Sequence, residues 1–370
     1  MNSSPSAMVD VESNHSAAAE EEMARFPVAT KPASDKVVAK LDSEEEDSGF
    51  SMMEAEDSSS EEEEVRPDRF VDSHIRDAWN ARYACYFGRF EDTTKIPNMR
   101  FTYKKPKLHE SSVPTATLQI FSLKVAKIWG GLQWPLNVFG IVAVRDVVDH
   151  NRNMIFDRPR ESCQILTQED PYLKLTGPTR AVVLVDPVTF EVDLHVKGVT
   201  KDEDKRLSFL AVTYNDFTSI DSRLVKMDYA SKLSMVKFEL GSIVLSVEAT
   251  ISLRVKAGSG SWPDGFRAQI SARTASIGTA EVILLDSGDG TRVHVSRDGS
   301  IKLLRDVVSV EIIGKLEVYV KAVRGEEIVM DKKSFKAKKK NVSNGTLRLG
   351  FCTLDVTVAW SLVSTSLMGH

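Results

Sequence analysis

The sequence predicts an all-β protein: an antiparallel β-sandwich of one lobe or two stacked lobes, with one N-terminal amphipathic helix and a disordered acidic tail. Apolar and polar residues alternate in many short segments between Leu118 and Leu362, as in strands that bury one face. Gly, Pro, Asn and Asp separate these segments at short spacing. Helical periodicity is confined to one segment near residue 80, so strands dominate the prediction.

The first 66 residues form a distinct acidic segment. Residues 1–64 hold 18 acidic and 4 basic side chains, a net charge of −14, and the whole chain carries −5, which leaves +9 for residues 65–370. Blocks such as DSEEEDSG and SSSEEEE offer too little apolar surface to offset the entropy of ordering. We therefore predict a disordered tail over residues 1–66 that interacts with the basic body or competes with it for a third party.

Serines in this tail stand immediately before runs of glutamate. They are Ser43, Ser58, Ser59 and Ser60, a pattern typical of substrates of acidophilic kinases. The alternative interpretation is a plain solvating tail without modification. A match of Glu22–Phe26 to the EAARF core of ribosome-inactivating N-glycosidases lacks a preceding Tyr, and we interpret it as coincidence.

Residues 67–117 are predicted to hold a helix and an irregular connector. Apolar residues recur at steps of three and four between Pro67 and Phe90, with Asp68 near the start and Gly88 near the end, which indicates an amphipathic helix. Three prolines then interrupt residues 91–117, so no regular element is expected there.

Strands are predicted in series after Leu118, and we assign residues 118–368 to one β-rich domain. Two halves that meet near residues 225–240 would give sub-lobes at 118–230 and 231–368. The predicted strands are 138–144, 181–185, 190–197, 207–211, 243–255, 280–285, 293–295, 301–304, 307–313, 316–323 and 352–362.

Two dipeptides predict tight hairpin turns. Asp298-Gly299 and Asn344-Gly345 are residue types that tolerate positive φ at the two central positions of such a turn. Along the strand from Ile243, odd-numbered apolar residues are expected to face one way, with Val244 as the exception on the other face.

Composition narrows the class of protein. Cys85, Cys163 and Cys352 lie far apart without a CxxC pair, which favours reduced thiols over disulfides or a zinc site. There is no signal-peptide pattern and no transmembrane run, so we expect a cytoplasmic or nuclear protein without a membrane partner.

Several segments resemble a grass-specific plant family known only as a domain of unknown function. They include AWNARYACYFGRFEDTTKIPNMRFT, KLSMVKFELGSIVLSVEATISLRV and LGFCTLDVTVAWSLV, within a likeness that covers residues 75–365. Some members of that family are joined to a jasmonate-induced ribosome-inactivating N-glycosidase, so the resemblance implies a role in stress or defence. In this chain the acidic tail stands where that domain would lie, so no glycosidase activity is carried over.

Two groups of residues are candidates for a ligand or partner surface. Trp129 and Trp134 flank a Gly-Gly turn, where tryptophans serve either as a sugar- or peptide-binding platform or as buried corner residues. The lysine run comprises Lys332, Lys333, Lys336, Lys338, Lys339 and Lys340. It suits a polyanion or nuclear-import patch, or a solvated edge that resists aggregation.

The sequence contains little that indicates a catalytic or metal-binding site. HExxH, GxSxG and P-loop patterns do not occur, and no cofactor is implied. Asp146, Asp149, His150, Asn151 and Asp157 could bind calcium together with residues 202–204, but nearby arginines oppose a cation. His195 is predicted to be solvated.

Three functions therefore stay open. The first is a non-catalytic β-sandwich interaction module with an unknown protein partner or ligand. The second is an enzyme of unrecognised chemistry, or an accessory domain related to ribosome-inactivating proteins, which a pocket with converging titratable groups would support. The third is a polyanion or nucleic-acid binder masked by its tail, which requires basic residues gathered on one face with aromatic residues among them. Whether the protein is an enzyme is open, with the first function favoured.

Overall fold

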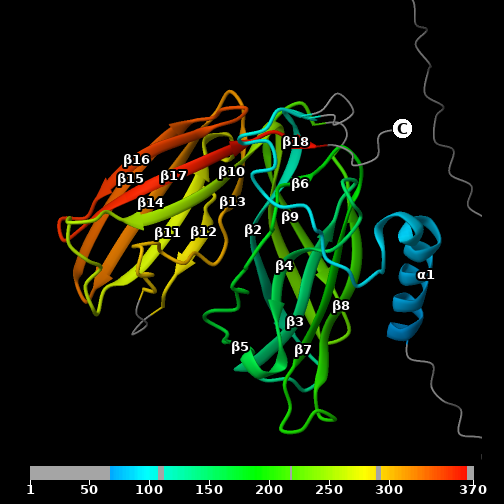
Figure 1. Ribbon diagram of the computed structural model, residues 1–370. Coiled ribbons are helices and arrows are strands. Elements are labelled where there is room, and N and C mark those ends of the chain that lie inside the picture. The colour runs from blue at the N-terminus through cyan, green and yellow to red at the C-terminus, as the bar shows by residue number, and fades with distance from the viewer. Residues whose placement is uncertain (1–66, 107–111, 217–218, 289–292, 365–370) are drawn as a thin grey trace, which may run out of the picture. The chain divides into compact units, whose positions relative to one another are not determined.

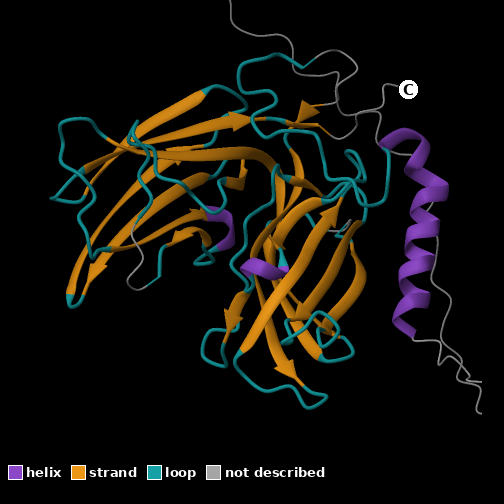
Figure 2. Cartoon of the chain, turned by 60° about the horizontal axis from the view of Figure 1, so that its bottom comes forward, coloured by secondary structure: helices purple, strands orange, loops and turns teal. Residues whose placement is uncertain are grey.

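The computed structural model describes residues 67–106, 112–216, 219–288 and 293–364, all within one compact unit, Glu63–His370. Strands make up most of this part, and one long helix accompanies them (Figure 1, Figure 2). The predicted all-β class with an N-terminal helix is thereby confirmed. The tail at residues 1–66 and its four candidate serines lie outside the described residues. None of the helices in the described ranges is long and apolar enough to cross a membrane.

The helix α1 (Pro67–Phe87) is the amphipathic helix that the sequence predicts. Trp79, Tyr83 and Phe87 follow each other at steps of four, which places them on one face. The helix ends at Gly88, whose φ of 98° suits glycine and whose backbone N–H donates to the carbonyl of Ala84. Trp79 is buried and its two successors are half-buried, so this face packs against the protein.

The first sandwich is formed by two antiparallel sheets. One sheet has the order β4-β3-β7-β8, with β5 beside β3, and the other has the order β9-β10-β2-β6. Alternate residues of both sheets, such as Phe190 and Phe238 with ring centroids 5.0 Å apart, fill the core between them. The bounds are β2 (Thr115–Ile128), β3 (Leu136–Arg145), β4 (Asn153–Arg158), β5 (Gln164–Leu166), β6 (Val182–Val183), β7 (Val188–Val196), β8 (Lys205–Tyr214) and β9 (Arg223–Ala230). A short 3₁₀ turn, η1 (Arg160–Ser162), lies between β4 and β5.

The second sandwich repeats this plan. Its four-stranded sheet has the order β12-β11-β14-β15, and β13, β10, β17 and β16 form the facing sheet. Trp360 is the largest fully buried side chain of the core between them. The bounds are β11 (Arg267–Thr274), β12 (Val282–Asp286), β13 (Val307–Glu311), β14 (Lys315–Arg324), β15 (Glu327–Lys336), β16 (Val342–Arg348) and β17 (Thr353–Ser361), with the 3₁₀ turn η2 (Ala275–Ile277) after β11. A separate two-stranded sheet pairs β1 (Ser112–Val113) with β18 (Val363–Ser364).

The strand β10 (Ser234–Val255) belongs to both sandwiches. Its first half lies between β9 and β2, and its second half lies between β13 and β17. The change of partner falls at a register shift between Ile243 and Ser246, where Leu245 has a φ of 44° and is exposed. Leu245 therefore departs from the predicted alternation, because the bulge turns its side chain out of the core. Core membership changes between Leu240 and Ile243, next to the region where the sequence places a division.

Buried polar contacts join the two cores beside β10. Arg305 donates hydrogen bonds of 2.8 Å to the carbonyls of Ile283, Ile120 and Phe121. Burial lowers the pKa of this guanidinium to about 9, and three carbonyl dipoles take the place of a carboxylate partner. The Gln119 carboxamide accepts the N–H of Ser309. These bonds attach β2 of the first sandwich to β12 and β13 of the second.

Several predicted elements need correction. Asn344-Gly345 is not a turn but lies inside β16, where a Cβ on Gly345 would stand 2.9 Å from the ring of Phe335, so this glycine serves close packing. At Asp298-Gly299 only Gly299 takes a positive φ, and the hairpin holds one isolated bridge, Val295 to Ile301. The predicted strand at 181–185 shrinks to Val182–Val183. The predicted strands 293–295 and 301–304 are reduced to isolated bridges. Strands β4, β9, β11 and β15 are not predicted, and in β9 and β15 charged residues interrupt the apolar pattern.

Candidate functional site

A cavity of about 580 Å³ lies between α1 and the outer face of the first sandwich. Its floor consists of side chains in two rows across the neighbouring strands β3, β7 and β8. In one row Thr189 of β7 pairs with Arg145 of β3 and with Thr213 of β8. In the next row Glu191 of β7 pairs with Ala211 of β8. These residues alternate with the core residues of the same strands, so they point away from the core. The size is in the range of small-molecule sites.

The helix forms the opposite wall through its aromatic residues. The indole N–H of Trp79 donates to the carbonyl of His150 at 2.9 Å, and the ring packs edge-on against Phe90. Tyr83 stacks on the His150 imidazole with a centroid distance of 3.8 Å, and Phe87 meets the same imidazole edge-on. His150 ends the turn after β3 with a φ of 52°, a conformation that histidine tolerates better than most residues.

Arginines fix the side of the cavity next to Phe90. Arg145 donates to Glu191 at 2.8 Å and to the carbonyls of Phe90 and His150, and its guanidinium lies 4.1 Å from the centre of the Phe90 ring. Arg152 donates to both oxygens of Glu191. One carboxylate thus binds two guanidinium groups, which leaves the cluster with a positive charge. Burial lowers the pKa of Arg145, against the attraction of Glu191.

A second ion cluster supports the turn that carries His150. Arg180 donates to both oxygens of Asp146, at 2.6 and 2.8 Å, and to Asp149 at 3.0 Å, and all three side chains are at least 95% buried. Burial alone would lower the pKa of Arg180, but the two carboxylates outweigh it and raise that pKa above its usual range. Backbone N–H groups and Thr94 donate to the same carboxylates, so every oxygen has a donor.

Asp146 and Asp149 therefore give no support to the calcium alternative, because all four of their carboxylate oxygens accept hydrogen bonds from the protein. Within the described ranges, no group of three or more His, Cys, Asp or Glu side chains is placed to hold a metal ion. Asp204 of the second acidic set pairs with Arg160 at 2.8 Å instead. His195, predicted to be solvated, has a partner in Asp193 at 3.0 Å and stacks on Phe139.

Neutral groups are left open to the cavity. The hydroxyls of Thr189 and Thr213 and the imidazole nitrogens of His150 have no hydrogen-bond partner among the described residues. Burial lowers the pKa of His150, against the nearby Asp146 and Asp149, so this imidazole is neutral at pH 7. The cavity therefore combines aromatic walls with three neutral hydrogen-bonding groups, while its buried charges are bound to each other.

The sequence-predicted tryptophans and lysines lie in different sandwiches. Trp134 packs against the first core, and Trp129, about one-third exposed, donates its indole N–H to the carbonyl of Lys232. The lysine run begins on β15 of the second sandwich and continues into the next turn. None of the cavities described here brings the two groups together.

The lysines themselves divide between two faces of β15. Lys332 and Lys336 pair with Tyr319 and Lys315 of β14 on the outer face of the four-stranded sheet. Lys333 points the other way and crosses above Gly345 of β16. Lys338, Lys339 and Lys340 follow the end of the strand and are predominantly exposed.

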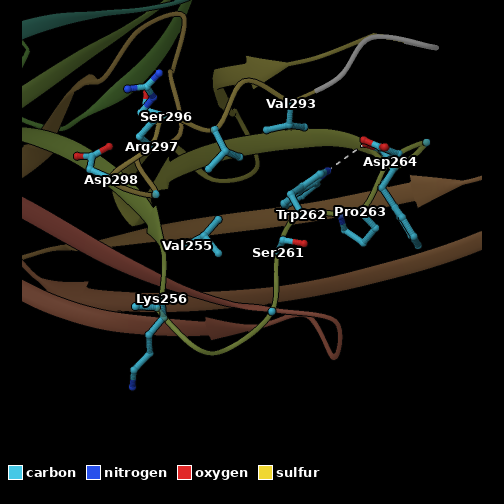
Figure 3. A pocket seen from close by; sticks show the side chains of 16 residues that line it. Val255, Lys256, Ser261, Trp262, Pro263, Asp264, Val293, Ser296, Arg297 and Asp298 are labelled. Carbon is cyan, nitrogen blue, oxygen red and sulfur yellow. Dashed lines mark hydrogen bonds between the residues drawn. The ribbon is translucent and has the colours of Figure 1, made fainter.

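Another pocket, of about 430 Å³, lies at the end of the second sandwich (Figure 3). Trp262 stands at its centre, with its indole N–H bonded to the carbonyl of Phe266 at 3.1 Å and Val255 and Val293 nearby. The side chains of Lys256 and Arg297 point away from Trp262 (Figure 3). Because the charged groups do not converge, we do not assign a function to this pocket.

The residues that form the helix-covered cavity are not recognisable as a site from the sequence. The position of Arg145 is a weak indication of a site. A charged residue that directly follows the apolar run Val142–Val144 needs a partner when it is buried. Nothing in the sequence indicates that Trp79 and Glu191, more than a hundred residues apart, line one cavity.

Comparisons with known proteins give a family but no activity. The family model described as Domain of unknown function (DUF6598) matches residues 117–358, which excludes α1. No curated protein matches. Among solved structures, human GIVD cytosolic phospholipase A2 is similar at 6% identity and a TM-score of 0.21 over 69% of this chain, which spans only 33% of that chain. A two-domain structure of Extended-Synaptotagmin 2 is similar at 10% identity and a TM-score of 0.22, over 74% of this chain and 99% of that chain. Sequence identities of 6 and 10% and TM-scores of 0.21 and 0.22 are too low to indicate a shared function.

Proposed function

Because the chain belongs to this family of unknown function, its role has to be inferred from the site, and we propose that it is a non-catalytic β-sandwich module that binds a small amphipathic ligand between α1 and the first sandwich. The observation that carries the proposal is the state of the cavity's polar groups. Its buried charges, Arg145 and Glu191, are bound to each other. The partly buried hydroxyl of Thr189 and the His150 imidazole are left open and are neutral, and the charged lining residues Arg82 and Asp186 are exposed to solvent. Such a site favours binding over proton transfer.

An enzyme is the weaker candidate. His150 is neutral and could accept a proton, but no hydroxyl or thiol among the described residues donates a hydrogen bond to it. Both oxygens of Glu191 accept hydrogen bonds from arginines, which keeps this carboxylate from acting as a general base. An accessory role beside a ribosome-inactivating protein rests on the family resemblance alone.

The lining indicates the class of ligand. Trp79, Tyr83 and Phe90 suit a flat apolar or aromatic body, and the hydroxyls of Thr189 and Thr213 suit one or two carbonyl or hydroxyl groups. A role of such a ligand in plant stress or defence is part of the same proposal and rests on the family resemblance.

Anilinonaphthalene sulfonate, an amphipathic fluorescent dye with one anionic sulfonate group, tests the site in the full-length protein. We expect saturable binding to one site and a loss of at least about tenfold in affinity for Ala211→Phe, which fills the floor of the cavity. Ala230→Phe, at an exposed position on β9, should bind the dye like the unchanged protein. Equal affinity of all three proteins, with matching melting curves, would overturn the proposal.

A second candidate function is polyanion binding on the outer face of β14 and β15. Lys332, Lys336 and Lys315 share this face, and Tyr319 lies between Lys332 and Arg273, with cation-to-ring distances of 5.5 and 4.7 Å. Basic residues with an aromatic residue among them are the pattern expected of such a surface.

Heparin chromatography tests this second candidate. The double variant Lys332→Ala/Lys336→Ala should elute at lower salt than the unchanged protein, because each lost cation weakens the attraction. The matched control is Lys226→Ala/Lys237→Ala in the first sandwich, which removes the same number of lysines away from this face. Equal shifts for the two double variants would point to net charge rather than to this surface.

A further inference from the structure

An open polar depression of about 730 Å³ lies on the outer face of the second sandwich, on β10, β17 and β16. Its floor is a regular grid of side chains. Ser252, Thr357 and Asn344 are paired in one row across the three strands, and Arg254, Asp355 and Thr346 are paired in the next. All six belong to the face opposite the core, so the depression is a built array of hydrogen-bonding groups.

Polar and charged side chains make up most of the lining of the depression. Its apolar lining residues Leu253, Ile301 and Val356 are at least 95% buried in the core and contribute little but backbone. A ligand placed here therefore meets hydroxyl, amide, carboxylate and cationic groups. An apolar or aromatic molecule would leave these polar groups without hydrogen-bond partners.

Many of these groups are free to bind. The carboxylate of Asp355 has no hydrogen bond or ion pair within the described part of the chain, and the same holds for the hydroxyls of Ser252 and Thr346. Thr357 donates to the Asn344 oxygen at 3.1 Å, which leaves the amide N–H groups of Asn344 for a ligand. Donors and acceptors thus alternate over neighbouring strands at the spacing of paired residues, about 5 Å.

Lys333 reaches this depression from the facing sheet. A Cβ on Gly345 would lie 2.9 Å from Cγ of Lys333, so the lysine stem occupies the space that a side chain at position 345 would fill. The missing side chain allows Lys333 to line the depression beside β16. This placement separates Lys333 from Lys332 and Lys336, which face the opposite side of the sandwich.

The charges around the depression are balanced. Lys333 and Arg254 are positive, Asp355 and Asp298 are negative, and Asp298 bonds Arg254 at 3.2 Å. A polyanion would be attracted by the cations but repelled by Asp355. A neutral molecule with several hydroxyl groups is complementary to the whole array, because each hydroxyl both donates and accepts.

We propose that this depression binds a neutral saccharide through hydrogen bonds to Asp355, Asn344, Arg254 and Lys333. Vicinal hydroxyls of one sugar ring suit the carboxylate of Asp355 and the donors on its neighbours. The open shape admits a chain of several sugar residues. This site is independent of the helix-covered cavity, which belongs to the first sandwich.

The probes are neutral hexasaccharides, namely cellohexaose, xylohexaose, mannohexaose and laminarihexaose, each added to the full-length protein and followed by saturation-transfer NMR. We expect at least one to bind with a dissociation constant of about 1 mM or tighter. For that sugar, Asp355→Ala and Asn344→Ala should each weaken binding at least about fivefold, since each removes groups that contact hydroxyls. Two variants are used so that the test does not depend on one variant that fails to fold.

Lys336→Ala is the matched control, because it lies on the same strand as Lys333 but on the other face. It should leave saccharide binding unchanged, and Lys333→Ala should weaken it. Ala211→Phe should also leave it unchanged, which separates this proposal from the helix-covered cavity. The proposal is wrong if none of the four sugars binds, or if binding persists in both Asp355→Ala and Asn344→Ala.

Discussion

At the scale of single residues, buried charged side chains stabilise the turn after β3. Arg180, Asp146 and Asp149 are removed from water, so each depends on the others for compensation. Glu248 of β10 joins them by accepting the N–H groups of Met99 and Ala181, and burial raises the pKa of this carboxyl. The cluster is thus bonded to several segments, and the loss of one member leaves the others unpaired.

Arg180→Met should lower the free energy of unfolding by about 3 to 5 kcal/mol, because two carboxylates stay buried without their cation. Urea unfolding followed by circular dichroism measures this change. Arg254→Ala is the control, since both Arg254 and its partner Asp298 are more than half exposed, and we expect no significant change there. A similar effect of both variants would contradict the assignment of Arg180 as a buried anchor.

At the scale of elements, α1 depends on a neutral His150. Burial holds the pKa of this imidazole below its ordinary value of 6.5, and the groups acting on it are Asp146, Asp149, Asp186 and Arg82. The unfolded chain takes up the proton first as pH falls, so the stability contributed by His150 is complete above pH 6.5 and is lost below it.

The free energy of unfolding should therefore fall as the pH drops below about 6.5, and more steeply in the unchanged protein than in His150→Asn. Asparagine also tolerates the positive φ at this position, so the variant tests the proton rather than the backbone. Urea titrations at a series of pH values give the two slopes. Parallel slopes would show that His150 does not titrate with unfolding.

Strand β16 gives a second prediction at this scale. Gly345→Ala should destabilise the protein by about 1 to 3 kcal/mol, because the added methyl group meets the buried ring of Phe335. It should also weaken saccharide binding by displacing Lys333. Thr346→Ala, on the outer face of the same strand, is the stability control. An unchanged melting temperature for Gly345→Ala would contradict the close contact.

The elements also show what the sequence can and cannot reveal. The elements α1, β7 and β17 are predictable because their own periodicity records which face is buried. The adjacent Lys332 and Lys333 obscure β15 in the sequence, because an edge strand carries charged side chains on both faces and these interrupt the alternation. The cavity is not predictable, since Trp79 and Glu191 meet only through tertiary packing. Gly345 shows the same limit, because its local signal for a turn is overruled by Phe335 of another sheet.

At the scale of the whole molecule, charge is divided unequally along the chain. Residues 1–64 carry −14 and residues 65–370 carry +9. A polyanion such as heparin therefore meets a molecule whose overall charge opposes it, although its body attracts it. Phosphorylation of Ser43 or of Ser58 to Ser60, which we propose, would increase this opposition.

Deletion of residues 1–64 should strengthen binding to heparin at low salt, and the gain should shrink as salt rises, because exposed charges are screened within about 10 Å at 0.1 M salt. Elution from a heparin column over a salt gradient measures the effect. Identical elution of the full-length and truncated proteins would leave the tail without influence on polyanion binding.

The shared strand β10 limits how this architecture can be rearranged. A protein built of separate modules can exchange or duplicate one of them through a linker, but here the joint between the sandwiches is a continuous strand, hydrogen-bonded on both edges. A chimera that replaces the second sandwich must be spliced inside β10. The bulge at Leu245 is the suitable point, because the strand changes partners there and the side chain contributes nothing to either core.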